Sequence, residues 1–151
     1  MNARRLRRIL QSDRHLSSRV VGIFAVDTLQ KCKLGPGQGV IVNTDVWKGR
    51  GIHWVVLYRS AQGNYEFFDS FGRPPQYYDE RFKTFLQRDL RDPIHNSMPL
   101  QDNDSDLCGA YVVYFLYFRS RGLTMKNIIS HFSSNSRLND KLVKAFVDEC
   151  F

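Results

Sequence analysis

The sequence predicts an α+β fold, because short apolar stretches typical of buried strands dominate its first half and helical patterns dominate its second. Two stretches carry most of this prediction. Residues 53–69 have the pattern of a β-hairpin, and residues 110–118 have the pattern of a buried helix. A chain of 151 residues that is 42% hydrophobic is long enough for one domain with a buried core, and we expect residues 1–151 to form that domain.

Residues 1–19 predict a basic helical segment. Leu6, Ile9 and Leu10 share one helical face, and the stretch contains a cluster of arginines, namely Arg4, Arg5, Arg7, Arg8 and Arg14. The net charge of +7 permits an acidic partner. Two interpretations stay open for the four arginines of residues 4–8. They contact the phosphates of DNA, or they are the solvated flank of a helix that docks by its apolar stripe.

Four stretches predict strands. Residues 20–26 and 40–44 are rich in Val and Ile, and turn-forming residues around Gly35-Pro36-Gly37 lie between them. Residues 53–59 and 65–69 are apolar and are joined by the turn residues 61–64, which indicates an antiparallel hairpin.

Four stretches predict helices. Residues 79–90, 125–132 and 139–151 each show an apolar stripe, for example Phe82, Phe85 and Leu86 in the first of them. The run 110–118 is apolar throughout and ends before Gly122, which is typical of a buried helix and its C-terminal stop. No stretch has the length of a membrane span or the pattern of a signal peptide, so we expect neither membrane insertion nor secretion.

Cys108 lies where the polar loop 101–107 meets that buried helix, and aspartates and a serine just upstream are suited to cap the helix start. The unpaired N–H groups of a helix start favour a thiolate, which makes Cys108 a candidate nucleophile. The alternative is an inert packed cysteine. Cys32, Cys108 and Cys150 have neither the spacing of a metal site nor the even number of a disulfide framework.

His53 begins the predicted hairpin and Asp69 ends it, so antiparallel pairing should bring their side chains together. A histidine that shares the cysteine proton, with a carboxylate that orients it, would activate Cys108. Gln101 could supply an amide donor to an oxyanion beside the backbone N–H of Cys108. The alternatives are a structural His–Asp hydrogen bond and an ordinary loop glutamine.

Three motifs in this order resemble those of the adenain family of cysteine proteases. They are His53-Trp54, then Asp69-Ser70-Phe71-Gly72, then Gln101 seven residues before Cys108-Gly109. These are the maturation proteases of adenoviruses, with relatives in Polinton/Maverick elements and adintovirus-like viruses and more distant cousins among the proteases of SUMO and ubiquitin-like modifiers. Residues 21–29 and 42–45 resemble the Polinton-type members, so the resemblance covers about residues 20–147.

The resemblance implies a papain-like cysteine-protease core of the adenain type, with a mixed central sheet and a buried nucleophile helix. It makes Cys108 the nucleophile, His53 the general base, Asp69 its orienting acid and Gln101 the oxyanion donor, with Trp54 beside the site. Adenoviral members carry Glu where this chain has Asp69, whereas the wider family has Asp.

The resemblance also implies a viral or transposon-encoded endopeptidase that cleaves structural precursor proteins at Gly-Gly-X or Gly-X-Gly-X sites during virion maturation. Such a protein acts as a monomer in the virion and host nucleus. DNA and an activating viral peptide are the family's cofactors, and Cys32 or Cys150 could hold such a peptide by a disulfide. The alternatives are a deubiquitinase or deSUMOylase in an intracellular, reducing compartment, and a non-catalytic interaction domain of the same fold.

Overall fold

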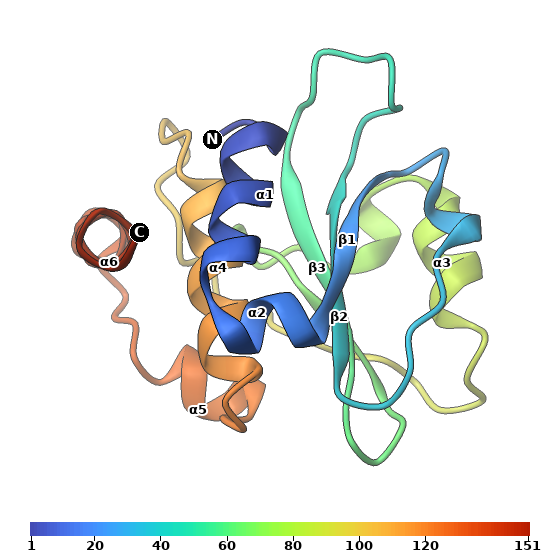
Figure 1. The fold of residues 1–151 in the computed structure, drawn as a ribbon. Coiled ribbons are helices and arrows are strands. Elements are labelled where there is room, and N and C mark those ends of the chain that lie inside the picture. Colours follow the sequence, from blue (N-terminus) through green and yellow to red (C-terminus); the bar gives the residue numbers. More distant parts are fainter.

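The computed structural model describes residues 1–151, which form a five-stranded mixed sheet flanked by helices (Figure 1). The sheet contains β1 (Val20–Ala25), β2 (Gln38–Asn43), β3 (Trp54–Arg59), β4 (Tyr65–Phe68) and β5 (Ile94–His95), in that spatial order. The two outer pairs are parallel and the two inner pairs are antiparallel. The α+β class and the mixed central sheet are therefore confirmed.

Helices cover both faces of this sheet unequally. In Figure 1 most of them lie on one side, whereas α3 lies on the other. Their bounds are α1 (Ala3–Ser12), α2 (Arg14–Arg19), α3 (Glu80–Leu86), α4 (Cys108–Arg119), α5 (Met125–Ile129) and α6 (Ser136–Cys150), with short 3-10 turns at Leu29–Lys31 and Pro75–Tyr77. No helix combines the length and the apolar character that a membrane span requires.

The alternation of side chains along the strands gives the sheet two apolar faces. On β3, Val56 and Tyr58 pack into the larger core around α4, while Val55 and Leu57 pack into the smaller core beneath α3. The first eight residues of α4 after Cys108 are all buried, so α4 is surrounded by the sheet and by the other helices. This arrangement confirms that the helix beginning at Cys108 is buried against the sheet.

Several details differ from the sequence-based predictions. The helix predicted over 125–132 ends at Ile129, and the one predicted over 139–151 begins at Ser136. The helix predicted over 79–90 ends at Leu86. Beyond that end the Arg88 guanidinium donates to the carbonyls of Cys32 and Gln30, and Leu90 is fully exposed, so no apolar contact extends the helix. The two-residue strand β5 was not predicted, since both its residues are exposed. The residue that caps α4 is Leu107, which offers no side-chain cap.

The basic N-terminal segment is helical, as its pattern predicts, with Leu6, Ile9 and Leu10 buried, but it contains a second helix, α2, that the pattern does not predict. Its arginines do not act as one surface, however. Arg5 lies 3.6 Å from Asp148 of α6, whereas Arg7 lines two surface pockets between α1 and β1.

Candidate active site

The end of the β3–β4 hairpin brings His53 and Asp69 together. The chain turns directly after β4, where the N–H of Gly72 donates to the carbonyl of Asp69 at 2.9 Å. Gly72 has a φ of +69°, and a Cβ there would lie 2.7 Å from the backbone of Met98, so no other residue fits this turn. The turn returns the Asp69 carboxylate to the imidazole, and the distance from His53 Nε2 to Asp69 Oδ1 is 2.6 Å. The predicted contact between these two side chains is confirmed.

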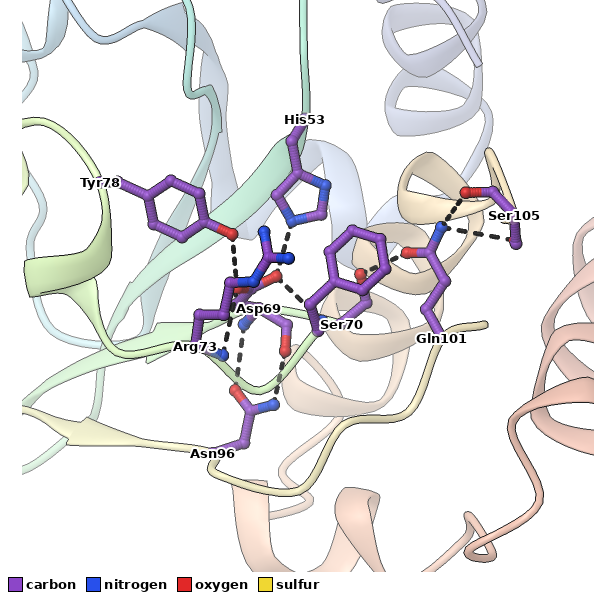
Figure 2. A network of polar contacts seen from close by, with 9 residues as sticks. His53, Asp69, Ser70, Arg73, Tyr78, Asn96, Gln101 and Ser105 are labelled. Atoms are coloured by element: carbon purple, nitrogen blue, oxygen red, sulfur yellow. Dashed lines mark hydrogen bonds and ion pairs between the residues drawn. The ribbon is translucent and has the colours of Figure 1, made fainter. Parts of the chain in front are cut away.

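The Asp69 carboxylate is fully buried and is satisfied on both oxygens. Oδ1 also accepts from the backbone N–H of Phe71 at 3.0 Å, and Oδ2 accepts from the Tyr78 hydroxyl at 2.7 Å (Figure 2). The Asn96 side chain holds the Asp69 backbone through two hydrogen bonds, of 3.0 and 2.6 Å. Burial alone would raise the pKa of Asp69, but its hydrogen bond to His53 and its other donors outweigh burial and lower the pKa.

Cys108 is the first residue of α4, and its thiol is half-buried. The N–H groups of Cys108 and Gly109 make no hydrogen bond within the chain, because the helix offers them no acceptor and the Ser105 hydroxyl accepts from Leu107 instead. These free donors lie at the helix start that carries the thiol and are of the kind that an oxyanion would need.

His53 and Cys108 line the same pocket, and each shifts the pKa of the other. Because Nε2 is engaged by the carboxylate, Nδ1 is the ring nitrogen left for Cys108. Burial opposes ionisation of both groups. For His53 the favourable interactions with Asp69 and Cys108 outweigh the effect of burial and raise its pKa to about 9. For Cys108 the favourable interactions with His53 and with the backbone of Trp54 outweigh the effect of burial and lower its pKa. Each group therefore stabilises the charged form of the other, the thiolate beside the imidazolium.

Gln101 lies in the same pocket as Cys108 and is buried. Its backbone N–H donates to the carbonyl of Ser70, and its side-chain Oε1 accepts from the Ser70 hydroxyl at 2.6 Å. This contact directs the amide nitrogen toward the loop before Cys108, where Nε2 donates to the Ser105 carbonyl at 2.8 Å (Figure 2). The same nitrogen lies 3.4 Å from the Ser105 hydroxyl, so both contacts of the amide nitrogen are with Ser105.

The pocket around these residues has a volume of about 630 Å³ and exposes the reactive groups to a ligand. Trp54 lines it, as the resemblance implies, and so do Phe71 and Tyr78, whose rings lie 4.9 and 6.0 Å from the His53 ring centroid. The start of α1 forms a further wall, since Met1 lines the pocket and accepts a 2.9 Å hydrogen bond from the Trp54 indole.

The sequence analysis missed Tyr78, Asn96 and the wall formed by Met1. None of them lies next to a recognised motif, and each reaches the site through a contact of long sequence separation or through a loop without regular structure. The remaining cysteines lie elsewhere. Cys32 is buried in the smaller core, where burial raises its pKa to about 11, and Cys150 is exposed at the end of α6. No three His, Cys, Asp or Glu side chains form a metal-binding group.

Tyr78→Phe should lower kcat about tenfold and leave KM unchanged, because it removes one charge-assisted hydrogen bond from Asp69 while keeping the ring. Tyr77→Phe is the matched control, since Tyr77 lines the same pocket but its hydroxyl makes no hydrogen bond within the chain. Steady-state kinetics on a cleaved peptide, with a melting curve for each variant, measure the effect. Equal kinetics for the two variants would show that the Tyr78 hydroxyl does not support the site.

No protein-family model matches this sequence, and no curated protein matches it significantly. Several solved structures match this chain, two of them at the following low sequence identities. One is the ASFV pS273R protease, with 24% sequence identity and a TM-score of 0.44 over 70% of this chain. The chain spans 42% of the length of that protease. The other is the central domain of the Lpg1148 protein from Legionella pneumophila, with 17% identity and a TM-score of 0.46 over 85% of this chain and 88% of that one.

Proposed function

We propose that this protein is a cysteine endopeptidase that uses Cys108, His53, Asp69 and Gln101. The observation that carries the proposal is the 2.6 Å contact between a buried carboxylate and His53, in a pocket that His53 shares with a half-buried thiol at the start of a helix. An inert core cysteine needs neither the histidine nor the open pocket beside it. A structural His–Asp pair does not need the thiol.

In the proposed reaction the Cys108 thiolate attacks the carbonyl carbon of the scissile bond and forms a tetrahedral oxyanion. The backbone N–H of Cys108 and the Gln101 amide stabilise this oxyanion. The His53 imidazolium then gives its proton to the leaving amine, and a thioester to Cys108 remains. Neutral His53 takes a proton from water, the hydroxide attacks the thioester, and the thiolate leaves as the acid product is released. Asp69 holds the imidazole in position throughout.

The proposed substrates are precursor proteins cut at Gly-Gly-X or Gly-X-Gly-X sites, as in virion maturation. The resemblance to the adenain family supports this choice. An isopeptidase that acts on ubiquitin or SUMO conjugates shares the chemistry and the preference for Gly-Gly tails, and a non-catalytic domain of the same fold is the third possibility.

A panel of substrates separates these three functions. The protein would be incubated with internally quenched Gly-Gly and Gly-X-Gly peptides and, in parallel, with ubiquitin and SUMO conjugates. An endopeptidase cleaves the peptides in a manner that requires Cys108. Cleavage of the conjugates alone would establish an isopeptidase, and no cleavage of any substrate would contradict catalysis.

Gln101→Ala should reduce kcat by about 10² to 10³, the effect of losing one oxyanion donor. The variant should also lose stability, because it leaves the buried Ser70 hydroxyl without its acceptor. Ser70→Ala is therefore the matched control, since it breaks the same hydrogen bond but keeps the amide. Equal losses of kcat in the two variants would assign Gln101 a structural role.

We also propose that Arg4, Arg5, Arg7 and Arg8 give the protein a sequence-independent affinity for DNA, on the grounds of the net charge of +7. Fluorescence anisotropy with a short random duplex over a salt series tests this. The logarithm of the affinity should fall with a slope of about −0.9 per neutralised phosphate. Replacement of the four arginines by Gln should flatten that slope. No binding at low salt would leave the cluster as a solvated helix flank.

A further inference from the structure

A second pocket, of about 500 Å³, adjoins the candidate active site. It lies between the start of α1, the strand β1 and the β2–β3 connection, which extends beyond the sheet at the end where α1 begins (Figure 1). The two pockets share Met1, Asn43, Gly51 and Trp54 in their walls. A chain bound across Cys108 could therefore continue into the second pocket by passing Trp54.

Apolar side chains form much of the walls of this second pocket. Ile23 and Phe24 of β1 form one side, and Val46 and Trp47 of the β2–β3 connection form another. Val46 is 43% exposed and Trp47 is 55% exposed, so both present large apolar surfaces that the chain itself does not cover. Apolar surface of this kind beside a cleft is typical of a binding site.

The β2–β3 connection that carries these residues is held in place by hydrogen bonds. The Asp27 carboxylate accepts from the backbone N–H of Trp47 at 2.7 Å. The Asp45 carboxylate accepts from Val46 at 2.8 Å and from Gly51 at 3.2 Å. Both nearby carboxylates are therefore engaged with the backbone of the connection, and neither lines the pocket.

The charge of the pocket is positive. Arg7 and Arg50 both line it, no acidic side chain does, and neither arginine takes part in an ion pair within the chain. A guanidinium without a partner is suited to bind a carboxylate through two parallel hydrogen bonds. The apolar walls do not suit a phosphate backbone, which presents no apolar group to bury. A peptide that combines an apolar side chain with a carboxylate fits both features.

We propose that this pocket is a second substrate subsite, which accepts a bulky apolar side chain with an adjacent Glu or Asp in the sequence that flanks the cleaved bond. The inference rests on the proposed endopeptidase function, which it deepens by defining the acidic character of the substrate. Trp47 and Phe24 bury the apolar side chain, and Arg7 and Arg50 bind the carboxylate. Arg7 is thereby a specificity-determining residue.

Binding of labelled peptides to the Cys108→Ala protein tests the subsite without any need for turnover. The peptides carry Gly-Gly at the centre and Leu-Glu, Leu-Gln, Leu-Lys or Ala-Glu in one flank, with a second series that places these pairs in the other flank. In one of the two series the Leu-Glu peptide should bind about tenfold more tightly than the Leu-Lys peptide. This preference should weaken at high salt, because the pocket is open to solvent.

Charge reversal identifies the residues responsible. Adding Arg7→Glu and Arg50→Glu should invert the preference, so that the Leu-Lys peptide binds more tightly. Arg4→Glu with Arg8→Glu changes the net charge equally, on a part of α1 that does not line the pocket, and should keep the preference for Leu-Glu. Equal affinities for Glu and Lys peptides, or the same result from both double variants, would overturn the subsite. Failure of the wild-type protein to cleave any peptide would instead contradict the endopeptidase function, whatever the binding shows.

Discussion

Replacement of Cys108 by alanine should abolish peptide cleavage, with a loss of at least about 10⁴ in kcat/KM. The reason is that no other thiol can take over. Cys32 is buried in the smaller core and Cys150 lies at the end of α6, and neither lines the pocket that holds His53. Cleavage of a Gly-Gly peptide, followed over a wide range of enzyme concentration, measures the loss.

Cys150→Ala is the matched control for this variant, because it removes an exposed thiol at no cost to either core. It should retain full activity. The melting temperature of Cys108→Ala should stay close to that of the parent, since the thiol makes only the contacts of a half-buried group. Activity that survived in Cys108→Ala would assign cleavage to another residue or to a contaminant.

Replacement of His53 by alanine should lower kcat/KM by about 10² to 10⁴, the usual contribution of a general acid and base. Two effects combine in this variant. The thiol loses the hydrogen bond that lowers its pKa, and the leaving amine loses its proton donor. His15→Ala, on the exposed side of α2, is the control and should be silent. A comparable loss in both variants would point to a general effect on the protein.

Asp69→Asn does not isolate the effect of the carboxylate charge on the rate, because the substitution also disturbs hydrogen bonds that hold the fold. Each Asp69 oxygen accepts from two donors, including Phe71 N–H on Oδ1 and the Tyr78 hydroxyl on Oδ2. An amide nitrogen in either place would face donors instead of acceptors. We therefore expect Asp69→Asn to lose stability as well as rate. Tyr78→Phe, which removes one hydrogen bond to this carboxylate, is the better test of its role.

The core of the candidate site was predictable because it depends on local geometry. A hairpin whose turn residues lie at 61–64 must bring its two ends together, and His53 and Asp69 occupy those ends. The position of Cys108 at the start of α4 follows equally from the change between a polar loop and an apolar run. Both predictions needed only residues that are close in the sequence or paired by one turn.

The surroundings of the site could not be predicted in this way. Tyr78 and Asn96 support Asp69 from a long connection whose path depends on the packing of α3 and on the unpredicted strand β5. The arginines of α1 looked alike in the sequence, yet Arg7 lines the second pocket while Arg5 faces Asp148. Such differences arise from the way in which α1 docks on the sheet, and the amphipathic pattern defines only which face is buried.

The rate at which iodoacetamide alkylates each cysteine at pH 6 tests the activated thiol most directly, because alkylation requires a thiolate and no substrate. An ordinary thiol is ionised to well under about 1% at this pH. His53 stays protonated until the pH rises through its pKa of about 9. Between the lowered pKa of Cys108 and the pKa of His53, the imidazolium therefore stabilises the Cys108 thiolate. We expect mass spectrometry to find Cys108 modified well before the exposed Cys150, with Cys32 unmodified, and we expect His53→Ala to remove this advantage. Modification of Cys108 no faster than Cys150 at pH 6, or an advantage that persists in His53→Ala, would contradict the assignment of Cys108 and His53 as a catalytic pair.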